Sequence, residues 1–164
     1  MREITAAAIT DCVRRLCLQA NRRLPADAEA ALRAAAETEP WPVASGILGE
    51  LCANLDAARE TELPICQDTG LVTVFAELGE DAHVSGFEEA VQEGVRRGYA
   101  EGYLRKSVVR DPLRRGNTGD NTPATIYLRL VPGDRLRLTV APKGAGSENM
   151  CAVKMLTPAE GEEG

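Results

Sequence analysis

Apolar residues recur at helical spacing throughout the first part of the chain. Residues 3–23 carry an apolar stripe, and arginines fall on the wetter face of the same segment. A proline interrupts this pattern, an alanine-rich acidic segment follows over 26–38, and a third apolar stripe covers 42–59. The pattern predicts three helices, so we expect residues 1–60 to form an N-terminal helical segment.

The hydrophobic pattern changes in the second part of the chain. Residues 71–78 are rich in β-branched side chains and predict a strand. Residues 85–102 return to helical spacing, and Ser85 with Glu88 three positions later is typical of a capping box. We therefore expect a sheet-containing portion over 61–158 that belongs to the same domain as the helices.

Two runs of alternating polar and apolar residues follow. They cover 124–130 and 135–140, and the intervening residues 131–134 have the composition of a turn. This arrangement predicts an antiparallel hairpin. We expect a further short strand over about 152–156 and a frayed acidic tail over 159–164. The fold class is thus α/β (or α+β), with an N-terminal helical layer followed by a mixed sheet with packed helices.

Composition narrows the class of protein. The chain has 164 residues, 44% of them hydrophobic and only 4% aromatic, so we expect one domain with an aliphatic core. A net charge of −6 argues against general nucleic-acid binding. No apolar run approaches the roughly 20 residues that span a membrane, and the N-terminus lacks a signal-peptide core. We therefore expect a cytoplasmic protein that binds neither nucleic acid nor membranes.

One histidine and five cysteines restrict the possible sites. A single histidine excludes a multi-histidine metal site, and an odd number of cysteines excludes a complete disulfide framework. In the cytoplasm the thiols should be reduced or bound to a metal. Four of the cysteines form no CxxC pair, and we interpret them as small buried hydrophobic residues: Cys12, Cys17, Cys52 and Cys151.

The fifth cysteine begins the segment Cys66-Gln67-Asp68-Thr69-Gly70, which leads into the predicted strand. A thiolate next to a carboxylate, an amide and a hydroxyl suits a metal or cluster site with acid–base groups beside it. The alternative is a buried cysteine at the start of a strand, with Asp68 capping a turn through its own backbone.

A basic segment precedes the first alternating run. It concentrates five cations in an otherwise acidic chain: Arg105, Lys106, Arg110, Arg114 and Arg115. Because a guanidinium binds a carboxylate through two hydrogen bonds, these residues indicate a small acidic ligand. Glycine, asparagine and threonine over 116–122 could add backbone donors. The alternative is a solvated loop whose Asn and Gly residues only form turns.

A second glycine-rich segment, Lys143-Gly144-Ala145-Gly146-Ser147, follows the last alternating run. It lacks the spacing and the final Lys-Ser/Thr pair of a nucleotide phosphate loop. A simpler anion-binding nest with one lysine fits these residues better.

Four segments in this order resemble the class I, iron–sulfur fumarate hydratases and the L-tartrate dehydratases. The resemblance covers essentially the whole chain as far as Pro158, and it corresponds to the N-terminal portion of the α subunit in two-subunit members. The segments that carry it are 64–70 (PICQDTG), 104–107 (LRKS), 117–124 (NTGDNTPA) and 142–150 (PKGAGSENM).

The resemblance implies a hydro-lyase that adds or removes water at a small dicarboxylate, either fumarate/malate or tartrate. It also implies a [4Fe–4S] cluster held by three cysteines, with Cys66 as the first ligand. Asp68 would be catalytic. The residues that would bind substrate are Gln67, Asp68, Thr69, Arg105, Lys143, Gly144 and Gly146, and the loop over 143–149 would line the site with backbone donors.

The chain departs from this family in length. Family α subunits continue further and carry the other two cluster cysteines there, and Cys151 matches neither of them. A β subunit or β domain would supply further catalytic residues. We therefore expect the cluster to be absent or incomplete in this chain, the isolated chain to be inactive, and the complete enzyme to be oligomeric. The alternative is a truncated, non-catalytic anion-binding or assembly module.

Overall fold

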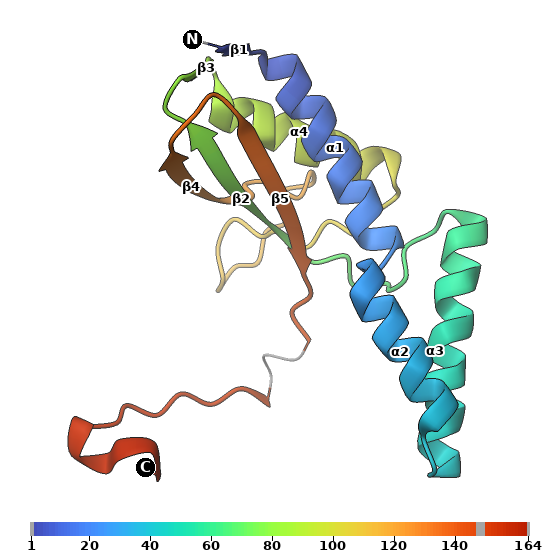
Figure 1. Ribbon diagram of the computed structural model, residues 1–164. Helices are drawn as coiled ribbons and strands as arrows, with labels where there is room; N and C mark the ends of the chain where they lie inside the picture. The colour runs from blue at the N-terminus through green and yellow to red at the C-terminus, as the bar shows by residue number, and fades with distance from the viewer. Residues whose placement is uncertain (1, 147–149, 164) are drawn as a thin grey trace.

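The computed structural model describes residues 2–146 and 150–163, and Figure 1 shows how they are arranged. Helices and a mixed sheet make up the fold, which confirms the expected α/β or α+β class. The elements, in chain order, are β1 (Arg2–Ile4), α1 (Ala6–Arg22), α2 (Ala26–Thr38), α3 (Pro42–Thr61), β2 (Leu71–Gly79), β3 (Ala82–Val84), α4 (Phe87–Glu101), β4 (Thr125–Val131), β5 (Leu136–Lys143) and η2 (Pro158–Glu163).

The main sheet has three strands with β2 in the centre. β4 pairs with β2 in parallel, so that Val74 lies opposite Ile126. β5 pairs with the other edge of β2 in antiparallel fashion, so that Val74 also lies opposite Val140. β1 and β3 form a separate two-stranded parallel sheet.

The expected hairpin between 124–130 and 135–140 is wrong. Both runs are strands and run in opposite directions, but β2 lies between them. The turn that joins them passes over the end of β2, where the Gly79 amide donates to Arg135 O (2.8 Å) and the Glu80 amide to Val131 O (2.9 Å). Alternating polarity and turn composition predict two strands and a reversal of chain direction. They cannot predict that a strand from elsewhere in the chain lies between the two.

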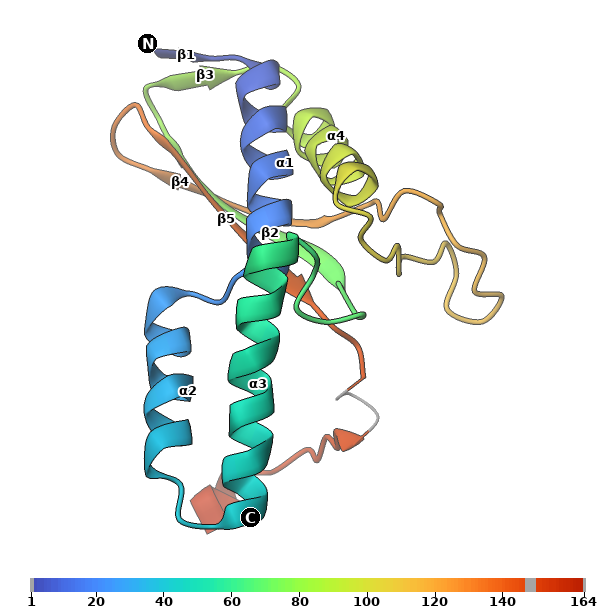
Figure 2. The ribbon, with the colours of Figure 1, turned by 90° about the vertical axis from the view of Figure 1, so that its right-hand side faces the viewer.

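α1 and α4 pack together and cover one face of the sheet, as Figures 1 and 2 show. Two glycines of α4 allow this close packing. A Cβ at position 94 would lie 2.7 Å from Val13 Cβ, and one at position 98 would lie 2.9 Å from Cys17 Cβ. The core is mainly aliphatic, as expected; its central residues are Ile9, Val13, Cys17, Val72, Val74, Val91, Val95 and Tyr99.

α2 and α3 form a helical hairpin that extends beyond the sheet (Figure 2). α2 has its predicted bounds, and α3 runs two residues past the expected end. The two helices are joined by an arginine–carboxylate network in which Arg33 contacts Asp56 (2.6 Å) and Arg59 contacts Glu29 (2.7 Å). The proposed division of the chain at residue 60 stays a prediction.

Three local expectations are wrong. Residues 3 and 4 belong to β1 rather than to the first helix, because β1 pairs with β3 and the helix begins only after Thr5. α4 has no capping box: its N-cap is Gly86, and the Ser85 hydroxyl instead contacts His83 Nε2 (3.3 Å). Residues 151–157 have no regular secondary structure, so no strand forms over 152–156. A short 3₁₀ helix, η2, follows them.

Within the ranges that the structure describes, none of the helices combines the length and the apolar character needed to cross a membrane.

The close contact between α1 and α4 predicts opposite effects for two Gly→Ala substitutions. Gly94→Ala should lower the free energy of unfolding by about 1–3 kcal/mol, because the new methyl group overlaps Val13 and the Thr10 carbonyl. Gly46→Ala in α3 is the matched control. Nothing lies within 4 Å of its new Cβ, so it should raise the free energy by roughly 0.5–1 kcal/mol. Denaturant unfolding measures both, and a Gly94→Ala protein as stable as the wild type would contradict the packing.

Candidate functional site

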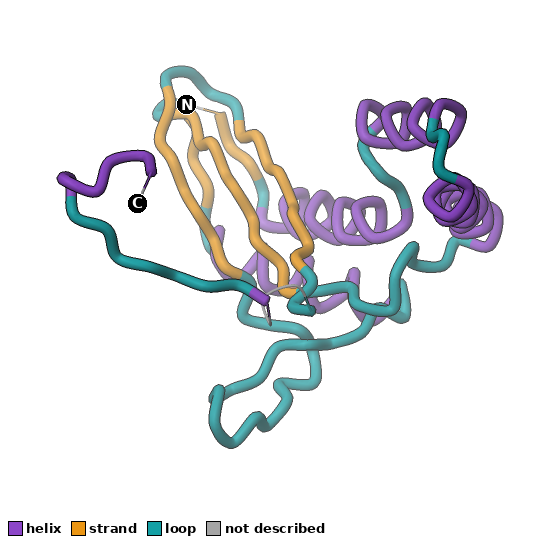
Figure 3. Tube along the Cα trace, turned by 90° about the horizontal axis from the view of Figure 1, so that it is seen from below, coloured by secondary structure: helices purple, strands orange, loops and turns teal. Residues whose placement is uncertain are grey.

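The polar segments singled out in the sequence meet at one end of the sheet. β2 and β4 are parallel and β5 is antiparallel to them, so the starts of β2 and β4 lie beside the end of β5. The segments 66–70, 117–124 and 143–146 are therefore brought to the same edge, where Figure 3 shows the loops gathered. Arg105 follows the C-terminal end of α4 and joins the same group through Thr69, whose hydroxyl donates to Arg105 O (2.9 Å).

Gly70 makes the contact between the first and last of these segments. Its φ is +70°, and a Cβ here would overlap the backbone carbonyl of Lys143 and crowd the Gly144 nitrogen. Only glycine combines this left-handed conformation with so close an approach of two backbones. The Cys66–Gly70 segment is thereby held directly against the Lys143–Gly146 loop.

Asp68 bridges the same two segments. One carboxylate oxygen, Oδ1, accepts a hydrogen bond from the Gly70 amide (3.1 Å), and Oδ2 accepts one from the Ala145 amide (3.0 Å). The first bond caps the turn through the backbone of the same segment, as the alternative interpretation expects. The second bond links Asp68 to a loop 77 residues away. Gly144 is also close: a Cβ there would lie 3.0 Å from Asp68 Oδ2.

Cys66 is exposed, which excludes the alternative of a buried cysteine at the start of the strand. The Asp68 amide donates to Cys66 Sγ (3.4 Å), and the thiol donates to Gln67 Oε1 (3.7 Å). An exposed cysteine sulfur is a possible metal ligand. Gln67 is exposed next to it.

Buried side chains hold the backbone at the entrance to β2. The Tyr99 hydroxyl donates to Thr69 O (2.5 Å) and contacts Gly70 O (3.2 Å), and burial raises the pKa of this phenol. Asn121, which is 0% exposed, donates from Nδ2 to Gly70 O (3.1 Å). Its Oδ1 accepts from the amides of Ser107 (2.7 Å) and Val108 (3.2 Å).

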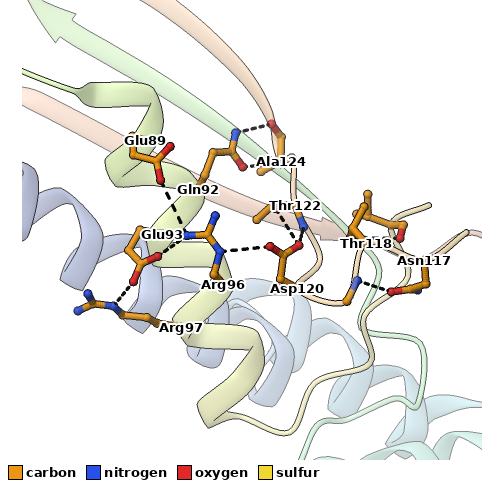
Figure 4. Close-up of polar contacts among 12 residues, drawn as sticks. Glu89, Gln92, Glu93, Arg96, Arg97, Asn117, Thr118, Asp120, Thr122 and Ala124 are labelled. Carbon is orange, nitrogen blue, oxygen red and sulfur yellow. Dashed lines mark hydrogen bonds and ion pairs between the residues drawn. The ribbon is translucent and has the colours of Figure 1, made fainter. Parts of the chain in front are cut away.

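α4 also holds the segment that precedes β4 (Figure 4). Arg96 Nε donates to Asp120 Oδ2 (3.2 Å), and the Thr122 amide and hydroxyl donate to Asp120 Oδ1 (3.0 and 2.8 Å). Desolvation alone would raise the pKa of Asp120, but the bonds from Thr122 and Arg96 lower it to about 2. The buried Gln92 amide pairs with Ala124 through both its donor (3.2 Å) and its acceptor (2.7 Å).

The four arginines of the basic segment divide into two groups, and Lys106, beside Arg105, is half-buried. Arg105 is exposed, and its guanidinium makes no hydrogen bond or ion pair with any described residue, so it can bind an anion. The other three arginines lie on a loop that a bridge between Val109 and Asn117 closes and that projects from the body in Figure 2: Arg110, Arg114 and Arg115. The structure therefore favours Arg105 alone as the arginine of this site.

The glycine-rich loop lies where the sequence indicated. Lys143 ends β5 and is exposed, and its ammonium donates to Gly144 O. Gly146 is exposed as well. The rest of the expected loop, Ser147, Glu148 and Asn149, lies outside the described residues.

The side chains that could bind iron decide whether an iron–sulfur cluster fits this site. Cys66 offers one exposed thiol with a backbone donor on its sulfur. Over 2–146 and 150–163, no group of three or more His, Cys, Asp or Glu side chains is placed to hold a metal ion. Cys66 thus fits as a single ligand, and these residues alone do not complete a site.

The remaining cysteines agree only partly with their interpretation as buried residues. Cys17 is fully buried, and burial raises its thiol pKa to about 12. Cys12 and Cys52 are half-buried. Cys151 is exposed, so that expectation is wrong for it, because no strand forms there to bury it.

Sequence reasoning missed the polar residues of α4 that organise the site. Gln92, Arg96 and Tyr99 follow each other at steps of four and three, which places them on one face of the helix. The sequence carries no signal for Gln92 and Tyr99, because only the structure shows that both are buried.

Comparison with known proteins agrees with the family resemblance seen in the sequence. A family model described as "Fumarate hydratase (Fumerase)" matches residues 10–164. The chain is 37% identical over 164 residues to "Putative L(+)-tartrate dehydratase subunit alpha" of Methanocaldococcus jannaschii, covering 95% of this chain and 57% of that protein. It is 26% identical over 160 residues to "L(+)-tartrate dehydratase subunit alpha" of Escherichia coli (strain UTI89 / UPEC), covering 95% and 53%.

A third relative is matched over a shorter stretch. "Fumarate hydratase class I, aerobic" of Escherichia coli (strain K12) is 38% identical over 99 residues, which is 58% of this chain and 18% of that protein. The chain thus spans about half the length of the two tartrate dehydratase subunits and a smaller part of the fumarate hydratase.

The low pKa of Asp120 predicts a dependence of stability on pH. A carboxyl whose pKa is lowered from 3.8 to about 2 stabilises the fold fully above the higher value, and loses this contribution as the pH falls towards 2. Asp120→Asn should lower the free energy of unfolding at pH 7 by about 1 kcal/mol, a figure discounted for partial exposure, and should reduce the loss between pH 4 and 2.

Asp134→Asn, in the exposed turn after β4, is the control and should leave the pH profile unchanged. Urea unfolding at several pH values measures the effect. The bonds from Thr122 and Arg96 to Asp120 would have no energetic role if Asp120→Asn and the wild type lost stability in parallel on acidification.

Proposed function

The chain belongs to the fumarate hydratase (Fumerase) family, and on that basis we propose that it forms the N-terminal portion of the α subunit of an iron–sulfur hydro-lyase. Its reaction would be the reversible hydration or dehydration of a small dicarboxylate, fumarate/malate or tartrate. One observation carries the proposal: the fold places Cys66, Asp68, the glycine loop at 143–146 and the segment of Arg105 at the same end of the sheet.

Substrate carboxylates need cationic or backbone donors, and this end of the sheet has both. The Arg105 guanidinium is exposed and has no partner among residues 2–146 and 150–163, so it can form two parallel hydrogen bonds with one carboxylate. Lys143 adds a second positive charge, Gly146 leaves the backbone of its loop open to a ligand, and Gly144 lets the loop approach Asp68. Thr69 contributes by holding the carbonyl of Arg105, and Gln67 offers an exposed amide beside the thiol.

Asp68 is the residue that we propose for proton transfer or for orienting the reacting group. Each of its oxygens accepts one backbone hydrogen bond, which fixes the plane of the carboxylate. A carboxylate oxygen has a second lone pair, so each can still accept a proton or a hydrogen bond from a substrate hydroxyl. Fixing the acceptor before the substrate binds reduces the entropy that the reaction must lose.

Cys66 would hold one iron of a [4Fe–4S] cluster, and we propose that the other ligands come from the part of the relatives that this chain does not cover. When bound, such a cluster supplies an iron that acts as a Lewis acid on the hydroxyl and carboxylate of the substrate. The relatives named "subunit alpha" suggest a β subunit as partner. We expect the 164-residue chain alone to have little or no activity, and the complete enzyme to be an oligomer of the cytoplasm.

A second candidate follows from the missing metal ligands. The described residues place no group of three possible metal ligands together, so a non-catalytic anion-binding or assembly module would explain the same loops.

Activity of the assembled protein separates the two candidates. The chain would be produced anaerobically together with the remaining α-subunit residues and a β subunit, supplied with iron and sulfide, and assayed with fumarate, malate and tartrate. Hydro-lyase activity with at least one diacid is expected. An assembled, iron-loaded complex that turns over none of them would favour the non-catalytic module.

The assignment of Cys66 as a ligand predicts the outcome of two cysteine substitutions. In the reconstituted complex, Cys66→Ser should abolish the visible absorbance of the cluster, because serine does not replace the thiolate. Cys12→Ser, at a half-buried position on α1, should retain that absorbance. Equal loss in both variants would reject Cys66 as a specific ligand.

Arg105 has a separate kinetic prediction. Arg105→Ala should lower kcat/KM for the diacid by about 100-fold or more, because a charge-assisted contact worth roughly 3 kcal/mol is lost. Arg110→Ala, on the projecting loop, is the control and should change kcat/KM less than about twofold. Steady-state kinetics of the complex measures both, and unchanged kinetics for Arg105→Ala would exclude the contact.

A further inference from the structure

α4 presents a row of polar side chains to the loops of the site. Gln92, Arg96 and Tyr99 lie on one face of this helix, and each holds a different piece of backbone or side chain (Figure 4 shows the first two). Their partners are, in order, Ala124, Asp120 and the carbonyls of Thr69 and Gly70. One rigid helix therefore fixes both the entrance to β2 and the segment before β4.

Asn121 lies between these anchors and joins two loops to each other. It is completely buried, and its φ of 63° is a left-handed conformation that asparagine tolerates better than most residues. Arg96 and Thr122 hold its neighbour Asp120, so the backbone that carries Asn121 is itself fixed. The Asn121 side chain therefore cannot move with one of the two loops while the other stays in place.

The three hydrogen bonds of Asn121 connect the two halves of the site. Nδ2 donates to Gly70 O (3.1 Å), and Gly70 is two residues after Asp68. Oδ1 accepts from the Ser107 amide (2.7 Å), and Ser107 is two residues after Arg105. The Asn121 amide therefore joins the Cys66–Gly70 segment to the Arg105–Val108 segment from one side, and the bond from the Thr69 hydroxyl to Arg105 O (2.9 Å) joins them directly.

We propose that Asn121 is a positioning residue whose side chain, together with the Thr69–Arg105 bond, sets the distance between these two segments, and that it thereby affects how strongly the site prefers dicarboxylates to monocarboxylates. This inference rests on the proposed function, in which Arg105 binds one carboxylate while the other end of the diacid lies near Cys66 and Asp68. A fixed span favours a ligand whose two ends match it, because a mobile loop would have to be ordered at a cost in binding free energy.

An amide is needed because one group must accept on one side and donate on the other. In Asn121→Asp, an oxygen still accepts from the Ser107 and Val108 amides, but the donor to Gly70 O is replaced by a second oxygen. The bond from position 121 to the Cys66–Gly70 segment is then broken, while its bonds to the Arg105–Val108 segment are kept, and the Thr69–Arg105 bond is untouched. Asn121→Gly removes the whole side chain, introduces no charge, and suits the left-handed backbone.

The chain offers a matched control in Asn117. This asparagine is in the same loop and also holds the Arg105–Val108 segment, through a bond from Nδ2 to Lys106 O (2.8 Å), but it has no bond to Gly70. Asn117→Asp is thus the same chemical change on one side of the site only.

The test is calorimetric binding of succinate and of butyrate to the assembled complex, which requires no turnover. The ratio of the butyrate Kd to the succinate Kd reports the contribution of the second carboxylate. We expect Asn121→Asp to lower this ratio by about tenfold and Asn121→Gly to lower it at least as much, while Asn117→Asp changes it less than about twofold. Asn121→Gly keeps the test valid if the new carboxylate prevents folding.

Three results would overturn the inference. The first is a ratio unchanged in both Asn121 variants even though their thermal stability falls, since a purely structural role weakens both ligands equally. The second is an equal change in Asn117→Asp. The third is a wild-type complex without any preference for succinate. A wild-type complex that prefers succinate but catalyses no hydration would instead reject the proposed function and leave this inference standing.

Discussion

The carbonyl groups of Thr69 and Gly70, at the entrance to the central strand β2, must be hydrogen-bonded inside the protein. Leaving such groups buried without a donor would cost about 1–3 kcal/mol each. Tyr99 and Asn121 supply the donors, and Gly70 makes room for the end of β5. The site follows from this constraint, because satisfying two carbonyls brings α4, the segment after it and the segment before β4 to the same point.

The fold was predictable where local pattern decides it. The helix over 26–38 has its predicted bounds, and β2 differs from the predicted 71–78 by one residue. The period of the hydrophobic pattern and the flanking proline and glycine residues define both elements. Pairing was not predictable, because β2 inserts between two strands that a short turn joins. The capping box at Ser85 failed for a related reason: the residues match the motif, but Gly86 provides the left-handed entry to α4 instead.

The site shows the same division between local and long-range information. Segments with unusual chemistry, such as Cys66–Gly70 and the glycine loop after β5, stand out in the sequence as loop signatures. The residues that align these segments do not, because Gln92 and Tyr99 occupy ordinary helical positions and acquire their roles only through partners about 30 residues away. The hydrogen bond from the Ala145 amide to Asp68 joins residues 77 positions apart, and no sequence motif predicts it.

The most direct measurement of the central claim is a crystal structure of the assembled iron-loaded complex with succinate bound. We predict that Arg105 forms two hydrogen bonds with one carboxylate, that Cys66 Sγ is bonded to iron, and that the ligand lies between the Cys66–Gly70 segment and the glycine loop. Succinate bound away from both segments, with Cys66 still a free thiol beside an intact cluster, would contradict it.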